Sequence, residues 1–229
     1  MISRRLLLIQ VFFLCIGCSA SQPNDSPKLG KLVVGVVAYG EGTRSVDQYQ
    51  SFNQYLETRM KTLVELEPAF NEVKAVEQIQ RQTWSLVFAP PGLAAIAISK
   101  ANYLPLFPLE GVDNLSSVLV VKKDSSIQKL TDVTGKRIAL GQPGSATGYY
   151  VPLYELYGTT PAEVRIAPTP KIALEWLAKD QVAVAAMSKD EFDRYRRDFA
   201  PVEFRLFHTS RRIPSGAVLI SPEVDRNQQ

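Results

Sequence analysis

The chain has 229 residues, of which 45% are hydrophobic and 21% charged, and its formal net charge is +3. These proportions are typical of a globular protein and exclude a disordered chain, a collagen-like fibre and a protein with many membrane spans. The length allows one large domain or two lobes of about 100 residues each. The single histidine, His208, excludes metal sites built from several histidines and leaves little basis for a serine–histidine relay.

The N-terminal segment has the pattern of an export signal. Two arginines precede the apolar run 6–17, which is shorter than the roughly 20 residues that a bilayer-spanning helix needs. The end of this run resembles a bacterial lipobox, although Cys15 stands where leucine is usual. We therefore expect residues 1–17 to be a lipoprotein signal peptide. Residues 18–30 are then a lipidated Cys18 followed by a flexible polar tether.

An uncleaved N-terminal anchor and plain secretion remain the alternatives to lipidation. Both cysteines of the chain lie in this segment. Disulfides, thiolate chemistry and cysteine-bound metal are thereby excluded from the body of the protein.

From residue 31 onward, short runs of β-branched residues alternate with stretches of helical character. In the first half we expect strands over 32–38, 63–67, 86–89 and 104–109, and helices over 45–60, 70–82 and 92–99. In the second half we expect strands over 117–122, 137–141, 164–167, 182–187, 204–207 and 217–220, and helices over 147–156, 172–178 and 189–197.

This alternation predicts an α/β fold with mostly parallel sheets and helices on both faces. Two such halves predict two lobes with a cleft between them, as in a clamshell. The first lobe is expected over 31–115 and the second over 116–201. Residues 202–229 are expected to return to the first lobe, so that both final strands belong there. Many functions share this architecture.

The strongest local signal for chemistry is the loop that follows the strand at 137–141. Ser145 and Thr147 lie where a helix begins, and Gly148 allows a ligand to approach the backbone closely. The first N–H groups of a helix lack intrahelical partners and favour negative charge, so this turn suits a tetrahedral oxyanion. Ordinary N-capping by either hydroxyl is the alternative. The glycine spacing matches neither a P-loop nor a dinucleotide fingerprint.

Three consecutive segments of the chain resemble the phosphate/phosphite/phosphonate-binding proteins of ABC importers in residue type, order and spacing. They are 117–125, 130–140 and 144–149 together with Pro152, and the resemblance extends more loosely over 31–221, through 32–37, Tyr49, Tyr55 and 88–91. It implies the type 2 periplasmic-binding fold, which closes on its ligand between two lobes. It implies a binding protein rather than an enzyme, with no cofactor and no metal.

The resemblance also implies which residues hold the ligand. In the family a Ser/Thr turn cradles the phosphonate oxygens, and aromatic residues of the first lobe complete the pocket. The positions of this chain that match are Ser145, Ala146, Thr147, Gly148 and Tyr149 of the turn, and Tyr39 and Phe88 of the first lobe. Ala146 lacks a hydroxyl but keeps its backbone N–H. Lys171 is a candidate for an additional positive charge, or a solvated lysine in the first turn of a helix.

The chain departs from the family pattern at three places. Residues 168–171 stand where the family often has a histidine, and Ala183 replaces an acidic residue. Such carboxylates typically hold an amino group, so the change argues against 2-aminoethylphosphonate as ligand. The sequence also ends at Gln229, where family members usually continue with further helices.

These observations favour a lipid-anchored solute-binding protein that delivers a phosphate-like or phosphonate-like oxyanion to an ABC permease. It would be held by its lipid to a bacterial membrane, in the periplasm or on the exterior of the cell envelope. A ligand-sensing or orphan lipoprotein that signals to a membrane partner is the alternative. An enzyme is disfavoured, because no nucleophile–base pair is recognisable. Nucleic acid is not an expected partner, since acids and bases alternate over 189–197.

Overall fold

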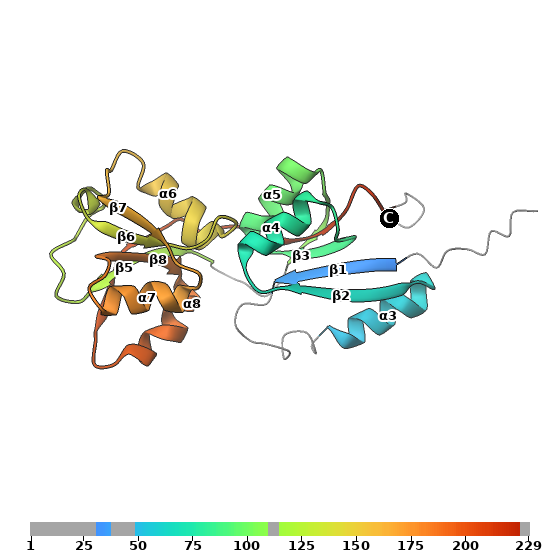
Figure 1. Cartoon of the computed structure of the whole chain (residues 1–229), viewed down its shortest axis with the longest axis horizontal. Coiled ribbons are helices and arrows are strands. Elements are labelled where there is room, and N and C mark those ends of the chain that lie inside the picture. Colours follow the sequence, from blue (N-terminus) through green and yellow to red (C-terminus); the bar gives the residue numbers. More distant parts are fainter. Residues whose placement is uncertain (1–30, 38–48, 110–114, 225–229) are drawn as a thin grey trace, which may run out of the picture. The chain divides into compact units, whose positions relative to one another are not determined.

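A computed structural model describes residues 31–37, 49–109 and 115–224 of the chain. Residues 31–229 make one compact unit. Within this unit the described strands form two five-stranded sheets, each covered by helices (Figure 1). We call the first sheet with its helices the first lobe and the second sheet with its helices the second lobe. No helix in the described part is long and apolar enough to cross a membrane.

The sheet of the first lobe has the strand order β2-β1-β3-β10-β4. Strand β1 runs parallel to β2 and β3, whereas β10 runs antiparallel to β3 and β4. The strands are β1 (Lys31–Val37), β2 (Leu63–Ala69), β3 (Leu86–Ala89), β4 (Leu104–Pro108) and β10 (Ala217–Ile220). The helices are α3 (Gln50–Met60), α4 (Glu72–Gln80) and α5 (Pro91–Ala101).

The two faces of this sheet are covered by different helices, as Figure 1 shows. On one face, Val87 and Ala89 of β3 pack with α4 and α5. On the other face, Leu86 and Phe88 pack with α3. This division follows from the period of two along a strand, which sends neighbouring side chains to opposite faces.

The core below α4 and α5 is organised around Trp84 and Tyr103, which are among the largest fully buried side chains. The hydroxyl of Tyr103 donates a hydrogen bond of 2.7 Å to the carbonyl oxygen of Trp84. Burial raises the pKa of Tyr103 to about 12, because the phenolate would lose its hydration. The hydroxyl therefore stays protonated and keeps this hydrogen bond at neutral pH.

The sheet of the second lobe has the strand order β7-β6-β8-β5-β9. Its strands are β5 (Ser117–Lys122), β6 (Arg137–Leu140), β7 (Glu163–Ile166), β8 (Val184–Ser188) and β9 (Phe204–Thr209). Its α-helices are α6 (Val151–Glu155), α7 (Pro170–Ala178) and α8 (Lys189–Tyr195), and the shorter helical turns are η1 (Leu130–Val133), η2 (Ala146–Tyr150) and η3 (Arg196–Phe199). Again the two faces are distinct: Val118 and Val120 face α7 and α8, whereas Leu119 and Val121 face the opposite core.

The sheets are mostly parallel, as expected, but both are mixed, because one strand of each runs opposite to the other four. Strands β6, β7 and β8 are parallel, but β5 is antiparallel to both β8 and β9. The first sheet has the same division, since β10 is antiparallel to both of its neighbours. A hydrophobic run shows that a strand is buried, but the direction in which the strand pairs is a long-range property that the run does not encode.

The chain also returns to the first lobe later than expected. Strand β9, which was assigned to the first lobe with β10, pairs with β5 along the edge of the second sheet. Its Phe204 and Leu206 pack on the same core as α7 and α8. Only β10 joins the first sheet, so the return lies between residues 210 and 216 rather than near residue 202.

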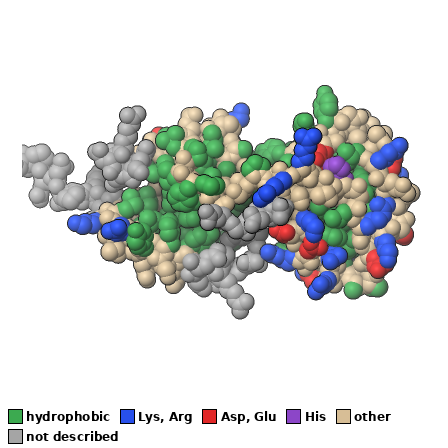
Figure 2. Space-filling model, turned by 180° about the vertical axis from the view of Figure 1, so that it is seen from behind, with side chains coloured by type: hydrophobic (Ala, Val, Ile, Leu, Met, Phe, Trp, Pro, Cys, Tyr) green, Lys and Arg blue, Asp and Glu red, His purple; other side chains and the backbone are tan. Residues whose placement is uncertain are grey.

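The charged side chains of the second lobe are interspersed in sign. Figure 2 shows lysine and arginine next to aspartate and glutamate over the face in view. Several of these charges form ion pairs, among them Lys122–Asp180 and Lys123–Glu203. The face of the second lobe in view therefore carries mixed charge.

Candidate functional site

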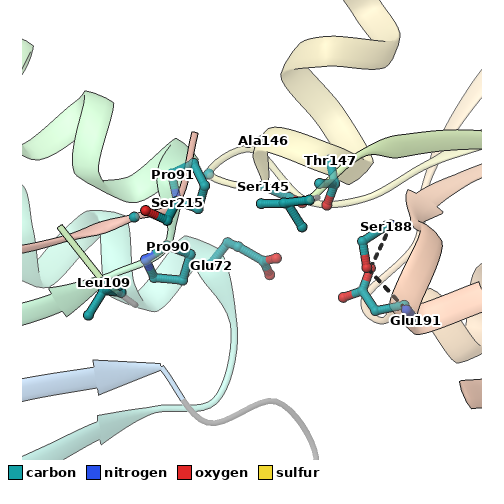
Figure 3. Close-up of a pocket in the computed structure, with 13 residues that line it drawn as sticks. Glu72, Pro90, Pro91, Leu109, Ser145, Ala146, Thr147, Ser188, Glu191 and Ser215 are labelled. Atoms are coloured by element: carbon teal, nitrogen blue, oxygen red, sulfur yellow. Dashed lines mark hydrogen bonds between the residues drawn. The ribbon is translucent and has the colours of Figure 1, made fainter. Parts of the chain in front are cut away.

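A cavity of about 220 Å³ lies where both lobes contribute residues that follow the carboxyl ends of parallel strands (Figure 3). This is the edge at which α/β sheets generally bind their ligands. The first lobe contributes Glu72 after β2, Pro90 and Pro91 after β3, Leu109 after β4, and Ser215 and Gly216 before β10. The second lobe contributes Leu115, Gly144, Ser145, Ala146 and Thr147, and Ser188 and Glu191 of the α8 start.

The turn after β6 is closed by Ser145, which acts as an N-cap. Its hydroxyl oxygen accepts a hydrogen bond of 3.0 Å from the backbone N–H of Gly148. The N–H of Gly141 donates to the carbonyl oxygen of Gly148 at 2.8 Å, which fixes the other side of the turn. Ser145 therefore has the N-capping role that the sequence allowed for either hydroxyl of the turn. Since the hydroxyl accepts in this bond, its own hydrogen remains available to donate into the cavity.

Thr147 places in the cavity wall a hydroxyl that has no partner among the described residues. The residue is only 8% exposed, and its carbonyl oxygen accepts a hydrogen bond of 2.6 Å from the hydroxyl of Ser117. Its side-chain hydroxyl makes no hydrogen bond to any described residue, and Figure 3 shows it directed into the cavity. The backbone N–H groups of Ala146 and Thr147 also have no acceptor in the described part of the chain. Buried hydroxyl and N–H groups are normally hydrogen-bonded. The groups in this wall have no such partner in the described residues, so they are available to donate to a ligand.

Two glycines allow the second lobe to approach the first very closely. A Cβ built on Gly92, in the first turn of α5, would lie 2.1 Å from the carbonyl oxygen of Gly144 and 2.7 Å from the nitrogen of Ala146. Gly144 has φ +117°, and a Cβ there would lie 2.8 Å from the Cβ of Glu72. Gly92 is therefore required because there is no space for a Cβ. Gly144 is required for the same reason and also because its positive φ disfavours other residues.

Two carboxylates that the sequence did not single out lie in the cavity wall. Glu72 begins α4, and Glu191 belongs to the first turn of α8. Glu191 forms a capping box: its Oε2 accepts from the N–H of Ser188 at 2.8 Å, and its own N–H donates to the hydroxyl of Ser188 at 3.1 Å. Their position in the sequence could have identified them, because both lie in the first turn of a helix that directly follows a strand in the parallel part of a sheet.

Two of the residues expected to bind ligand are engaged elsewhere. The ring of Phe88 lies 5.3 Å from that of Tyr49 and 5.4 Å from that of Phe52, in the core below α3, and it does not line the cavity. The ammonium group of Lys171 donates a hydrogen bond of 2.7 Å to a carboxylate oxygen of Asp198. This hydrogen bond and the negative charge of Asp198 raise the pKa of Lys171. Its alternative interpretation, an exposed lysine in the first turn of a helix, fits this position.

The other predicted site residues, and His208, lie outside the cavity wall or outside the described residues. Gly148 is buried behind the turn, and Tyr149 packs against the core that contains Leu119. Tyr39 and Cys18 lie outside the described residues. The ring of His208 lies 2.9 Å from a carboxylate oxygen of Glu155, away from the cavity, in keeping with a structural histidine. Within residues 31–37, 49–109 and 115–224, no group of His, Cys, Asp or Glu side chains is arranged to hold a metal ion.

A family model described as ABC transporter, phosphonate, periplasmic substrate-binding protein matches residues 34–229. The chain belongs to this family. The match includes both lobes and all residues that line the cavity, and it confirms the resemblance deduced from the Ser/Thr turn. This periplasmic family serves transport, which also confirms that the protein is not an enzyme. No curated protein sequence matches the chain significantly.

Solved structures share the fold of this phosphonate-family protein at low sequence identity. XAC2383 from Xanthomonas citri, bound to chloride ion, has a TM-score of 0.74 and 21% identity over 86% of this chain and 80% of that chain. A binding protein component of an ABC phosphonate transporter from Pseudomonas aeruginosa has a TM-score of 0.66 and 16% identity over 87% and 71%. PhnD1 from Prochlorococcus marinus, in complex with methylphosphonate, has a TM-score of 0.69 and 15% identity over 86% and 79%. These similarities confirm the two-lobed α/β fold of periplasmic binding proteins.

Proposed function

We propose that this substrate-binding protein of an ABC phosphonate-type transporter is a lipoprotein that captures a phosphonate-like or phosphate-like anion in the cavity between its lobes. The observation that carries the proposal is Thr147, a buried residue whose hydroxyl points into the cavity with no partner among the described residues. The hydroxyl of Ser145 and the N–H groups of Ala146 and Thr147 add further donors to the same wall.

The donor set suits a tetrahedral anion with several oxygens. A hydrogen bond to a charged group contributes about 1.5–3 kcal/mol, so a few such bonds are needed to offset the cost of association. The methylphosphonate bound to the relative from Prochlorococcus supports a phosphonate as the first probe. Another protein of the same fold binds chloride, so the fold by itself does not select the anion.

Replacing Thr147 with valine is expected to weaken binding of the anion by roughly 10- to 150-fold, which corresponds to one hydrogen bond to a charged acceptor. Valine has nearly the same shape and removes only the hydroxyl. Because this hydroxyl has no partner in the described residues, the melting temperature without ligand should change little. The measurement is calorimetric titration of the full chain in detergent with methylphosphonate, 2-aminoethylphosphonate, phosphate, phosphite and sulfate.

The matched control is Thr131→Val, which removes an exposed hydroxyl in η1 outside the cavity. It should leave all affinities unchanged. Equal binding by Thr147→Val and the unmodified protein would contradict the proposed site. A chain that is folded but binds none of the five anions would contradict the proposed function.

The lipid anchor is proposed from the sequence, since Cys18 follows an apolar run and a small residue and precedes a polar tether. Replacing Cys18 with serine is expected to abolish incorporation of labelled fatty acid and to release the protein from the membrane fraction. Cys15→Ser is the matched control, because it changes the neighbouring cysteine and should leave labelling intact. Fatty-acid labelling that survives Cys18→Ser would refute this anchor.

A further inference from the structure

The second sheet ends at a strand whose outer side pairs with no other strand among the described residues. Strand β7 pairs with β6 alone, and Figure 1 shows it at the edge of the sheet. Two of its four residues have exposed apolar side chains, since Val164 is 44% exposed and Ile166 is 43% exposed. An edge strand with exposed apolar side chains is a template for pairing with another chain. The outer edge of β7 is therefore a candidate interaction surface.

The backbone groups of these two residues point away from the sheet. Leu140 of β6 lies opposite Ile166, and its carbonyl oxygen accepts a hydrogen bond of 2.7 Å from the N–H of Ala167. In a parallel pair, a residue that faces its neighbour bonds to the residues that flank the one opposite, so Ile166 itself faces outward. Backbone direction alternates along a strand, and Val164 therefore faces outward as well. Each residue offers one N–H donor and one carbonyl acceptor to an added strand.

The charged residues of β7 alternate with the apolar ones, and they are of opposite sign. Glu163 is exposed and forms no ion pair with a described residue. The guanidinium of Arg165 lies 4.1 Å from the centre of the Trp176 ring and donates a hydrogen bond of 3.2 Å to the side-chain oxygen of Gln181. These contacts hold its positive charge on the face of the sheet that α7 covers. Glu163 lies on the same face, because side chains two residues apart in a strand point to one side.

The other face of β7 adjoins an exposed apolar side chain of α6. Val164 lies beside Ile138, which belongs to the core below α6. The side of α6 that carries Glu155 faces β9, because the carboxylate contacts His208 there at 2.9 Å. Leu153 is about 200° around the helix from Glu155 and is exposed. Since β7 and β9 are the two edges of the sheet, Leu153 faces β7.

We propose that β7 pairs antiparallel with β7 of a second copy of this chain, about a two-fold axis that places Val164 opposite Val164. In this register the two valines exchange both backbone hydrogen bonds, and Glu163 of each copy lies opposite Arg165 of the other. Two cross-strand ion pairs then form on the α7 face. The apolar residues of β7 and α6 from both copies lie together on the other face.

Other registers lack this complementarity. An axis at Glu163 or at Arg165 would place two like charges opposite each other, which disfavours pairing. An axis at Ile166 would place Arg165 opposite Ala167 and form no ion pair. Of the registers centred on the four residues of β7, only the one at Val164 combines outward-facing backbone groups with two pairs of opposite charge. The proposal does not depend on the anion site, because no residue of β7 or α6 lines the cavity.

Cysteine cross-linking tests both the pairing and its register. Antiparallel residues that exchange hydrogen bonds have Cα atoms about 5.5 Å apart, within the range that a disulfide spans. On oxidation with copper phenanthroline in air, the full chain with Val164→Cys in detergent is expected to give several-fold more disulfide-linked dimer than Ile166→Cys. This second variant is the matched control, since the residue is equally exposed on the same strand and its two copies would be about 13 Å apart. The unmodified chain measures any background from Cys15 and Cys18.

Charge reversal tests the ion pairs. Glu163→Arg places like charges opposite each other twice, so it is expected to raise the dissociation constant of the dimer roughly fourfold or more. Adding Arg165→Glu restores opposite charges and should return the constant toward that of the unmodified protein. Sedimentation of the full chain in density-matched detergent measures these constants. Asp124→Arg is the matched control, because it reverses an exposed acidic charge outside β7 and α6 and should change nothing.

Melting temperatures verify that the variants fold. Arg165→Glu removes the stacking on Trp176, and if it unfolds the chain, the cross-linking and the single reversal still decide, because both keep Arg165. Linkage through Ile166→Cys instead of Val164→Cys would overturn the register and its ion pairs. Equal linkage of both variants, or an unmodified chain that sediments as a monomer at all accessible concentrations, would overturn the dimer. A folded double reversal that associates no better than Glu163→Arg would contradict the ion pairs.

Discussion

Replacing Gly92 with alanine is expected to weaken anion binding roughly 5- to 150-fold, while the free protein stays folded. The new Cβ would lie 2.1 Å from the carbonyl oxygen of Gly144, which belongs to the loop that forms the donor wall. Overpacking of this kind costs about 1–3 kcal/mol, and relief requires the loop to move away from α5. Within α5 itself alanine is favourable, since it exceeds glycine in helix propensity by up to about 1 kcal/mol.

The measurement is titration of the full chain with the best ligand of the anion panel, together with its melting temperature with and without that ligand. Ser99→Ala is the matched control, because it raises helix propensity on the exposed side of the same helix and touches no cavity residue. It should bind as the unmodified protein does. If Gly92→Ala retained full affinity, the close approach of the Gly144 loop to α5 would not be required for binding.

Replacing Gly35 with alanine is expected to destabilise the whole protein by about 3 kcal/mol, near the upper end of the usual range for overpacking. Gly35 lies in the middle of β1, and a Cβ there would be 2.0–2.6 Å from three ring carbons of Trp84, which is completely buried. In a protein of this size such a loss lowers the melting temperature by roughly 6–12 °C. Thermal and chemical unfolding of the full chain measure it.

A double-mutant cycle identifies the cause. Trp84→Phe shortens the ring that the new Cβ would meet, and it loses no hydrogen bond, because the Nε1 of Trp84 has no partner in the described residues. Alone, this change should destabilise the protein by opening a cavity. Combined with Gly35→Ala, it should cost less than the sum of the two single changes. Additive effects would mean that the ring of Trp84 is not what excludes a side chain at Gly35.

Local sequence patterns predicted most elements of secondary structure. The strand Leu86–Ala89 has the expected bounds, and the helix predicted over 172–178 is present as Pro170–Ala178. Both are defined by short-range properties, namely a compact apolar run and a helix start after Thr169. The pairing of β9 with the second sheet was predicted wrongly, because it depends on contacts with β5, more than eighty residues earlier in the chain.

The cavity shows the same difference between features set by neighbouring residues and features set by long-range contacts. The sequence alone identified the Ser145–Thr147 turn, since a strand, a glycine-bearing loop and a helix start are neighbours in the chain, and it identified the family through that turn. Only the tertiary structure decided that Phe88 points into the core below α3 and that Lys171 pairs with Asp198. It alone brought Glu72 and Glu191 to the cavity wall. These placements depend on strand register and on the packing of helices, which combine residues far apart in sequence, whereas a turn is set by its own few residues.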